Sequence, residues 1–206
     1  MTEHRLFDPA DPPEWLDPEW WREREHCDHL GSPTGAHVAR LKAAAAMAGS
    51  LALSMKGGYV VDLGAGDGAL LSLLPDSLRD CSFGYDIIRA DVMHANTVRG
   101  VKVWLRNVGK AVHRGAPIGG PVVVLTEVLE HMADPHGFLA DLRKQAGLRY
   151  VVASSPANET PEQHEWNHAY CWDTHGYAAM FEAAGFMAKQ LQPVEWSQLW
   201  TFEVAP

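Results

Sequence analysis

A glycine-rich segment in the first half of the chain constrains the fold more than any other feature of this sequence. Residues 59–63 (YVVDL) form a short apolar run, and the alternating glycines of GAGDG follow directly at 64–68. A buried strand that leads through such glycines into a helix is typical of an open α/β sheet, in which ligands bind at the carboxyl ends of the strands. We therefore expect a ligand site around residues 62–68.

The rest of the chain alternates between strand-like and helix-like segments. Helices are expected at 35–55, 69–79, 134–146 and 173–184, and strands at 59–63, 81–88, 101–108, 121–126, 149–154, 187–195 and 198–204. This alternation predicts a layered α/β domain with a mostly parallel sheet. The last two strands are expected to form a hairpin around residues 196–198, which adds one antiparallel strand.

Residues 1–34 differ from the remainder, because they contain five of the 13 prolines and three of the eight tryptophans. The prolines exclude one long helix here, although residues 20–30 are helix-like up to Gly31. We expect an N-terminal arm or cap at 1–34, with Ser32–Thr34 opening the first helix of a domain at 35–206. Two interpretations stay open: the arm packs its tryptophans on the domain, or it closes over a ligand site.

Composition narrows the class of protein. The net charge of −9 opposes broad binding to nucleic acid, and the 47% of hydrophobic residues is sufficient for a core. The three cysteines contain no Cys-x-x-Cys pair, which excludes a disulfide framework or zinc finger and favours a cytoplasmic location. No apolar run is long enough to predict a membrane span.

The acids around the glycines indicate which ligand is bound. A dinucleotide site prefers Gly-x-Gly-x-x-Gly, whereas this loop has Gly-x-Gly-x-Gly with Asp62 before it and Asp67 within it. Two carboxylates would repel a pyrophosphate but suit a ligand that carries an ammonium and a sulfonium. Asp86 ends the next predicted strand 22 residues after Gly64, where a carboxylate binds ribose hydroxyls.

Three segments together resemble the motifs of class I S-adenosylmethionine-dependent methyltransferases. They are VVDLGAGDGALL at 60–71, GYDI at 84–87 and TEVLEHMADP at 126–135. The resemblance extends over residues 35–206. It implies a Rossmann-like, doubly wound α/β/α sandwich with seven mostly parallel strands, the last of them antiparallel, and S-adenosylmethionine as the cofactor.

The same resemblance implies a role for individual residues. The glycine loop would hold the methionine part of the cofactor, Asp86 the ribose, and Ile87 the adenine. Asn107 stands where many members have an aspartate that meets the adenine amino group, so the assignment there departs from the family pattern. The predicted cofactor-binding residues are Asp62, Gly64, Ala65, Gly66, Asp67, Gly68, Asp86, Ile87, Asn107, Val108 and Glu127.

A Glu-x-x-Glu-His pattern follows the fourth strand of the predicted domain. Glu127, Glu130 and His131, completed by a later histidine such as His164, are suited to Mg²⁺ or Mn²⁺. The pattern is similar to the metal site of small-RNA 3′-terminal 2′-O-methyltransferases. It also occurs in ubiquinone-pathway O-methyltransferases and in relatives without metal, so a purely structural acid–histidine pair stays open as the alternative.

These features predict methyl transfer to an oxygen or nitrogen of a small molecule. His131, His164 and Glu127 are the candidate catalytic residues, with His168 behind them, because a hydroxyl acceptor must lose its proton. His26 and His29 are expected to be solvated or packing residues. The alternatives are metal-assisted 2′-O-methylation of an RNA 3′ end and a non-catalytic cofactor-binding subunit. The sequence leaves the substrate and the oligomeric state open.

Overall fold

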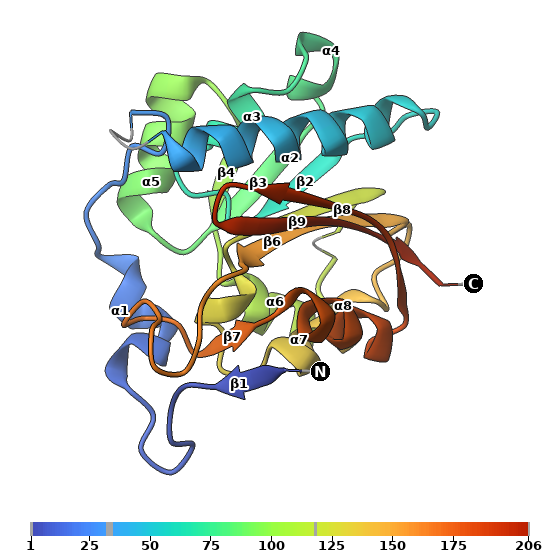
Figure 1. The fold of residues 1–206 in the computed structure, drawn as a ribbon. Coiled ribbons are helices and arrows are strands. Elements are labelled where there is room, and N and C mark those ends of the chain that lie inside the picture. The colour runs from blue at the N-terminus through green and yellow to red at the C-terminus, as the bar shows by residue number, and fades with distance from the viewer. Residues whose placement is uncertain (1, 32–34, 118, 206) are drawn as a thin grey trace.

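The computed structural model describes residues 2–31, 35–117 and 119–205. They form three layers, in which a seven-stranded sheet lies between two layers of helices (Figure 1). In spatial order its strands are β4 (Val103–Leu105), β3 (Phe83–Asp86), β2 (Val60–Leu63), β5 (Val122–Thr126), β6 (Tyr150–Pro156), β9 (Ser197–Val204) and β8 (Phe186–Val194). The neighbours from β4 to β6 are parallel, and β9 runs antiparallel to both β6 and β8. The predicted Rossmann-like sheet with an antiparallel last strand is confirmed.

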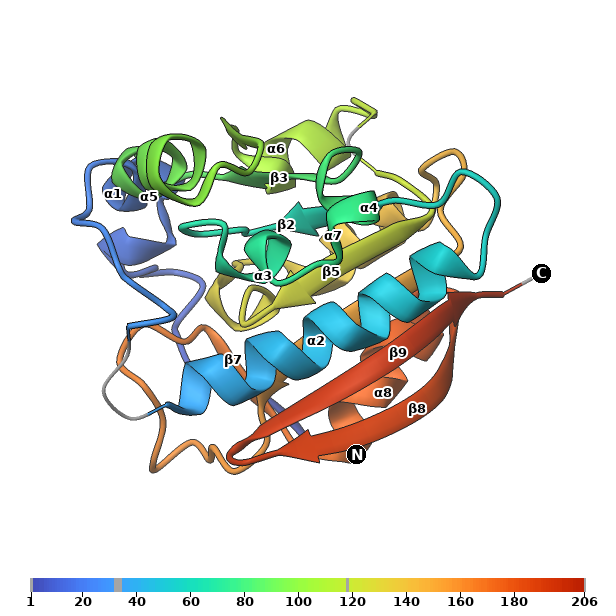
Figure 2. The ribbon, with the colours of Figure 1, turned by 90° about the horizontal axis from the view of Figure 1, so that it is seen from above.

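Both faces of the sheet are covered by helices. One face is covered by α2 (Ala36–Leu53), α3 (Ala69–Ser72) and α4 (Asp76–Arg79), and the other by α6 (Val108–His113), α7 (Pro135–Leu142) and α8 (Thr174–Ala183). Because side chains alternate along a strand, Val60 packs against the first group and Val61 against the second. Figure 2 shows α2 crossing the sheet along one face.

Several local predictions differ from the structure. The helix predicted at 69–79 is divided at Pro75, where the ring removes a donor and prevents a continuous helix. Two helical segments were not predicted. The first consists of α5 (Arg89–His94) and the π-helical turn η2 (Ala95–Arg99) that continues it, and the second is α6. The final hairpin turns at Glu195 and Trp196 rather than at 196–198, and Glu195 has a φ of 53°.

The N-terminal arm is built from short elements. A strand β1 (Glu3–Arg5) pairs antiparallel with β7 (Tyr170–Trp172), a two-stranded sheet that was not predicted. Next come the 3-10 turn η1 (Glu14–Leu16) and the helix α1 (Pro18–Arg22). The arm therefore lies across the segment that follows β6.

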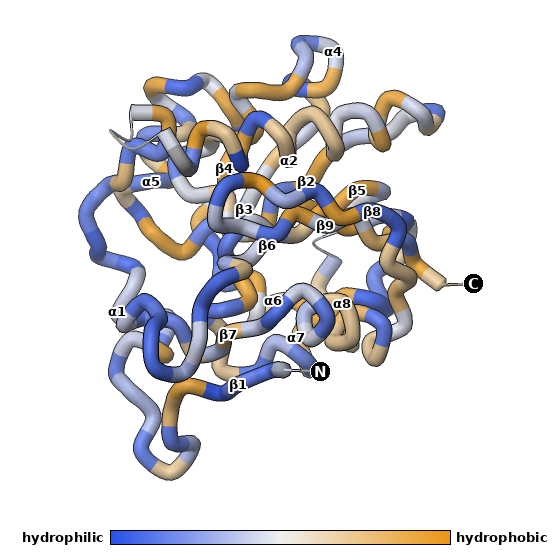
Figure 3. Tube along the Cα trace, in the orientation of Figure 1, coloured by the Kyte–Doolittle hydropathy of each residue, from blue (hydrophilic) through white to orange (hydrophobic). Residues whose placement is uncertain are grey.

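The predicted helix at 20–30 ends at Arg22, and the chain continues without regular structure to Gly31. The backbone N–H of Cys27 donates to Asp91 at 3.0 Å, and that of His29 donates to Asp67 at 3.3 Å, so neither joins a helical ladder. Figure 3 shows this hydrophilic stretch in contrast to the hydrophobic strands. The predicted helix opening at Ser32–Thr34 lies outside the described residues.

No helix in the described part of the chain is long and apolar enough to cross a membrane.

Candidate active site

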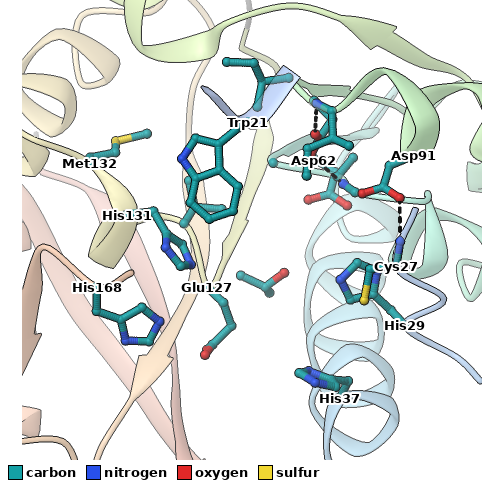
Figure 4. Close-up of a pocket in the computed structure, with 18 of the residues that line it drawn as sticks. Trp21, Cys27, His29, His37, Asp62, Asp91, Glu127, His131, Met132 and His168 are labelled. Atoms are coloured by element: carbon teal, nitrogen blue, oxygen red, sulfur yellow. Dashed lines mark hydrogen bonds between the residues drawn. The ribbon is translucent and has the colours of Figure 1, made fainter. Parts of the chain in front are cut away.

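A cavity of about 1010 Å³ opens at the carboxyl ends of the parallel strands, and the N-terminal arm closes one side of it (Figure 4). Of the predicted site residues, those that line it are Asp62, Gly64, Ala65, Gly66, Asp67, Asp86, Ile87, Asn107, Val108, Glu127, His131 and His164. Gly68 and Glu130 are not among its lining residues. The volume is at the upper end of the range for small-molecule sites, so it has room for a cofactor and a substrate together.

The loop between β2 and α3 forms the floor of the cavity. Gly64, Gly66 and Gly68 all have positive φ angles, of 85°, 50° and 75°. A side chain at Gly64 would come within 2.5 Å of Val128, and one at Gly66 within 3.0 Å of His29. Glycine is therefore required both by the backbone conformation and by the close approach of neighbouring chains.

Asp62 at the end of β2 is the most informative carboxylate of this loop. Its side chain is buried, and its Oδ1 atom has no hydrogen-bond partner among the described residues. Burial, reinforced by the nearby charge of Asp86, raises the pKa of Asp62 to about 7. A buried acceptor without a donor is costly, so this oxygen is suited to receive a cationic donor from a ligand in the cavity.

Asp86 at the end of β3 is held by backbone donors. One oxygen accepts from the N–H of Gly66 and the other from the N–H of Ile88, both at 2.7 Å. Burial raises its pKa, and these hydrogen bonds oppose the increase. The carboxylate thus ties the glycine loop to the next strand and retains lone pairs toward the cavity.

Asp67 is satisfied by the protein itself. Its carboxylate accepts from the Nδ1 of His29 at 3.0 Å and pairs with the guanidinium of Arg99. Although burial would raise the pKa of Asp67, the hydrogen bonds from His29 and Arg99 hold it well below its usual range. The expectation that Asp62 and Asp67 both face a cationic ligand therefore does not match this geometry, in which only Asp62 is free.

Asn107 lies where an adenine contact was predicted, and it also begins α6. Its side chain accepts from the backbone N–H of Lys110 at 2.9 Å, which caps the helix. Asn107 and the adjoining Val108 both line the cavity. The residue therefore serves the local fold whether or not it touches a ligand.

Glu127 follows β5 with a φ of 56°, an unusual conformation for a residue with a side chain. Its Oε1 accepts from the hydroxyl of Ser154 at 2.8 Å, and its Oε2 lies 3.6 Å from Arg40. Burial raises its pKa, whereas the Arg40 charge opposes that shift. The strained backbone aims this carboxylate into the centre of the cavity, between the two groups of residues in Figure 4.

Glu130, His131 and His168 form a second cluster beside Glu127. One ligand atom from each lies within 4.8 Å of the others. Glu130 is fully buried, and neither of its carboxylate oxygens has a hydrogen-bond partner within the described chain. Burial raises its pKa well above the usual value, and the Glu127 charge adds to this. A buried carboxyl group without donors is stabilised either by protonation or by a bound cation.

The two histidines of this cluster are oriented by outer partners. His131 Nδ1 lies 3.0 Å from the carbonyl oxygen of Asn167, and His168 Nδ1 lies 2.7 Å from a carboxylate oxygen of Glu159. With Nδ1–H donating in each ring, both Nε2 lone pairs are free, which is how metal-binding histidines are commonly held. The donor set of one carboxylate and two imidazoles therefore fits a divalent metal ion.

His164 is not part of this cluster. It lies at the mouth of the cavity, is exposed, and has its Nδ1 3.3 Å from the carbonyl of Thr160. His168, four residues later, is the histidine that lies beside Glu130 and His131. Glu127 is likewise outside the set of atoms that come within 4.8 Å of one another.

Further lining residues were missed by the sequence analysis. Arg40 of α2 is only 4% exposed, and its Nε has no hydrogen-bond partner among the residues described. Trp21 and His29 come from the arm, where His29 was expected to be solvated or packed but instead bonds to Asp67. Arg40 is one of two cationic residues in an alanine-rich helix, which was a usable signal. Trp21 is one of the three arm tryptophans that the sequence analysis linked to the interpretation of the arm as a cap over a ligand site.

Comparison with known protein families identifies the domain. A family model described as a methyltransferase domain matches residues 36–191. The chain belongs to this methyltransferase family. It is a class I S-adenosylmethionine-dependent methyltransferase, as the motif resemblance predicted. No match was found among curated protein sequences.

Several solved methyltransferase structures share the fold. Magnesium protoporphyrin IX methyltransferase from Synechocystis PCC 6803 is 15% identical, with a TM-score of 0.62 over 87% of this chain and 90% of that one. The Burkholderia thailandensis 1,6-didemethyltoxoflavin N1-methyltransferase is 17% identical, with a TM-score of 0.61 over 84% and 85%. The methyltransferase domain of bacterial CtHen1-CN is 22% identical, with a TM-score of 0.61 over 82% and 99%. At these sequence identities, the structural similarity shows that the chain shares the fold of these methyltransferases.

Proposed function

We propose that this methyltransferase transfers the methyl group of S-adenosylmethionine to a hydroxyl oxygen of a small molecule, with a divalent cation beside the acceptor. Residues 35–206 would form the catalytic domain and residues 1–34 a cap over it. The observation that carries the proposal is the pair of unsatisfied buried carboxylates, Asp62 in the glycine loop and Glu130 beside two histidines. Each lacks a partner within the described residues, and each is suited to a different cation.

The cofactor half of the cavity supports this assignment. Asp62 would accept from the cofactor's ammonium group, Asp86 from its ribose hydroxyls, and Ile87 would pack on the adenine beside Asn107 and Val108. Arg40, with an unpartnered Nε in the wall, is suited to the carboxylate of the same amino acid moiety. The bound cofactor supplies an electrophilic methyl group on a sulfonium, and the protein supplies orientation and exclusion of water.

The acceptor half supports a metal-assisted reaction. Glu130, His131 and His168 would hold the ion, and its nitrogen ligands favour Mn²⁺ over Mg²⁺. A bound cation lowers the pKa of a coordinated hydroxyl and orients it. Glu127, aimed into the cavity and held by Ser154, is then the group best suited to take the hydroxyl proton. The acceptor oxygen forms the new O–CH₃ bond as the S–CH₃ bond breaks, which leaves S-adenosylhomocysteine.

The charges of the cavity favour a small molecule over RNA. Of its described lining residues, seven are acidic and only two are arginines. The acidic residues are Asp62, Asp67, Asp86, Asp91, Glu127, Glu159 and Glu165. Such a surface repels a phosphate backbone. We also propose a reducing, cytoplasmic setting, which the three unbridged cysteines support.

The decisive experiment measures transfer of a radiolabelled methyl group from S-adenosylmethionine to a panel of catechols, other phenols, amines and short RNAs. We expect labelling of hydroxyl compounds that Mn²⁺ stimulates and EDTA suppresses. Glu130→Gln, which keeps the shape but removes the charge, should lose the Mn²⁺ stimulation while it still binds S-adenosylhomocysteine. Transfer that is indifferent to EDTA would reject the metal. Labelling confined to RNA would replace the small-molecule substrate by an RNA end.

A further inference from the structure

Charge is distributed unevenly along this acidic chain. Residues 92–126 contain five lysines and arginines but no aspartate or glutamate, so all 26 acidic residues lie elsewhere. Residues 6–21 of the arm show the reverse pattern, with five acidic residues and no lysine or arginine. Exposed segments of opposite charge attract each other, so the surfaces that these two segments form are candidates for association.

The basic segment presents a tryptophan at the open edge of the sheet. β4 is an outer strand, and because side chains alternate along a strand, Lys102, Trp104 and Arg106 lie in one row on the same face. Trp104 is 48% exposed, and its ring lies 4.9 Å from that of Phe83 and 5.6 Å from that of Tyr85. These contacts position the indole, and a cation lies on either side of it.

The cations near this tryptophan are not neutralised within one copy. Of the described lysines and arginines in residues 92–126, Arg99 alone pairs with a carboxylate. The other four form a basic strip of Lys102, Arg106, Lys110 and Arg114. An exposed aromatic ring bordered by unpaired cations is suited to an apolar surface with acidic groups around it.

The acidic segment forms such a surface, an apolar groove in the arm with a volume of about 600 Å³. Its apolar lining residues are Phe7, Pro9, Pro12, Pro13, Leu16 and Ala133. Glu14 and Asp17 also line it, and neither forms an ion pair within the described chain. Arg5, the cation among the described lining residues, donates to the hydroxyl of Tyr170 at 3.0 Å. Figure 1 shows the loop before α1 projecting from the body of the molecule, so the groove is accessible.

The arm groove and the β4 edge are complementary in shape and in charge. The groove has room for one aromatic side chain, and its acids match the cations beside Trp104. No residue of β4 or α6 is among the described lining residues of the groove, so one copy does not bring the two surfaces together. A tryptophan that enters an apolar pocket is a common centre of a protein interface.

A nucleic acid is a poorer match for the basic strip. Carboxyl-bearing residues border it, because Lys102 donates to the backbone carbonyl of Asp80 and His113 lies 3.1 Å from the carboxylate of Asp141. A longer phosphate backbone would extend beyond four cations onto a protein whose net charge is −9. The observations therefore favour the arm groove of a second copy as the occupant.

We propose that two copies of this protein associate, with Trp104 of one copy seated in the arm groove of the other. Lys102 and Arg106 then lie against Glu14 and Asp17 of the second copy. Formed reciprocally, the same contact closes a two-fold dimer. This inference does not depend on the acceptor chemistry proposed above.

The contact would also bear on the active site. Leu16 lines both the arm groove and the catalytic cavity. A partner seated in the groove therefore holds the wall that the arm contributes to the cavity.

Sedimentation velocity of the full chain tests the association. We expect a dimer fraction that increases with protein concentration over ~10–500 µM, as for a small, reversible interface. Trp104→Ser should weaken the association by at least ~10-fold, because it removes the central side chain. The matched control is Leu53→Ser, which changes a 58% exposed apolar residue outside both surfaces and should leave the association within ~2-fold.

A charge exchange tests the pairing of the two surfaces directly. Glu14→Lys and Lys102→Glu should each weaken the association by ~5–30-fold, and the double variant should recover to within ~3-fold of the unmodified protein. Both side chains are exposed, so this cycle decides the question even if Trp104→Ser fails to fold. Thermal unfolding and S-adenosylhomocysteine calorimetry check that each variant is folded.

Three results would overturn the proposal. The first is a protein that stays monomeric at every concentration. The second is an association that Trp104→Ser and both charge reversals leave unchanged. The third is a monomeric protein that binds a short single-stranded RNA through Lys102, which would assign the basic strip to RNA. Retained S-adenosylhomocysteine binding in any of these cases leaves the proposed function standing.

Discussion

The two halves of the cavity are assembled in different ways. The cofactor half comes from the ends of the neighbouring strands β2 and β3, which carry Asp62 and Asp86, and the backbone of the glycine loop holds Asp86. The acceptor half combines Trp21 of the arm, His131 after β5 and His168 before β7. A site built from neighbouring strand ends follows from the sheet order, whereas a site built from irregular segments depends on how each one is anchored.

The largest effect should come from filling the cofactor loop. Gly66→Arg is expected to abolish detectable S-adenosylhomocysteine binding in calorimetry, because even a Cβ there would lie 3.0 Å from His29. Gly57→Arg is the matched control. Gly57 also has a positive φ, of 70°, but has no neighbour within 4 Å and is not a lining residue, so that variant should bind normally. Equal binding by both variants would show that the loop is not the cofactor site.

The acceptor half should respond to a pair of histidine variants. His168→Ala is expected to weaken Mn²⁺ binding by at least ~100-fold, measured by electron paramagnetic resonance, because it removes one of three ligands from a preformed site. His164→Ala should leave Mn²⁺ affinity within ~2-fold, since that ring is exposed and lies outside the cluster. The reverse pattern would restore the assignment made from the sequence and contradict the one made from the structure.

Asp62→Asn should weaken S-adenosylhomocysteine binding by ~30–100-fold, because a charge-assisted hydrogen bond in a buried site is replaced by a neutral one. The same change should stabilise the cofactor-free protein at pH 8. The pKa of Asp62 rises from 3.8 to about 7 on folding, so the folded state prefers the protonated acid and stability falls as the pH increases through that interval.

Thermal unfolding provides the measurement for this stability effect. At pH 8 the Tm of Asp62→Asn without cofactor should exceed that of the unmodified protein by roughly 5 °C, and at pH 4 the difference should be close to zero. Because ionised Asp62 binds the cofactor, affinity should also weaken as the pH falls from 8 to 6. A Tm difference that does not change with pH would mean that Asp62 is either exposed or hydrogen-bonded in the folded protein.

The smallest effect should come from the contact between the arm and the loop. Burial alone would lower the pKa of His29, but the hydrogen bond and charge of Asp67 outweigh it and raise that pKa. The ion pair is therefore complete below pH 6.5 and is lost as the pH rises through the raised value. His29→Gln should speed S-adenosylhomocysteine release by ~3–10-fold in stopped-flow fluorescence, whereas His113→Gln, in an exposed pair with Asp141, should not. Release of S-adenosylhomocysteine from the unmodified protein should become faster at alkaline pH. A release rate that does not change with pH would show that the arm does not control cofactor exchange.

The sequence was sufficient for the sheet and for most of the cofactor half. Buried strands, glycines and strand-end acids are local signals, so the sequence predicted a mostly parallel sheet, and residues 60–71 with Asp86 predicted much of the lining of the cofactor half. The sequence did not reveal that Asp67 is neutralised, because its partners His29 and Arg99 are separated from it by 38 and 32 residues. Hydrogen bonds over such distances leave no periodic pattern in the chain.

The acceptor half was predicted only in outline. The Glu-x-x-Glu-His pattern indicated Glu130 and His131, but the choice between His164 and His168 depends on the path of an irregular segment. That path is set by contacts such as the bond between Glu159 and His168, and by the backbone bond from Ala169 to Glu130. The path of the arm was not predictable for the same reason. It is set by Asp91 and Asp67, whose carboxylates accept hydrogen bonds from the backbone N–H groups of Cys27 and His29.

A crystal structure of the protein soaked with Mn²⁺ and S-adenosylhomocysteine tests the central claim most directly. The account predicts one anomalous difference peak in the cavity, bonded to Glu130, His131 and His168, with the amino group of S-adenosylhomocysteine on Asp62 and its ribose on Asp86. A peak elsewhere, for example at His26 and His94, or cofactor density that leaves Asp62 without a partner, would contradict it.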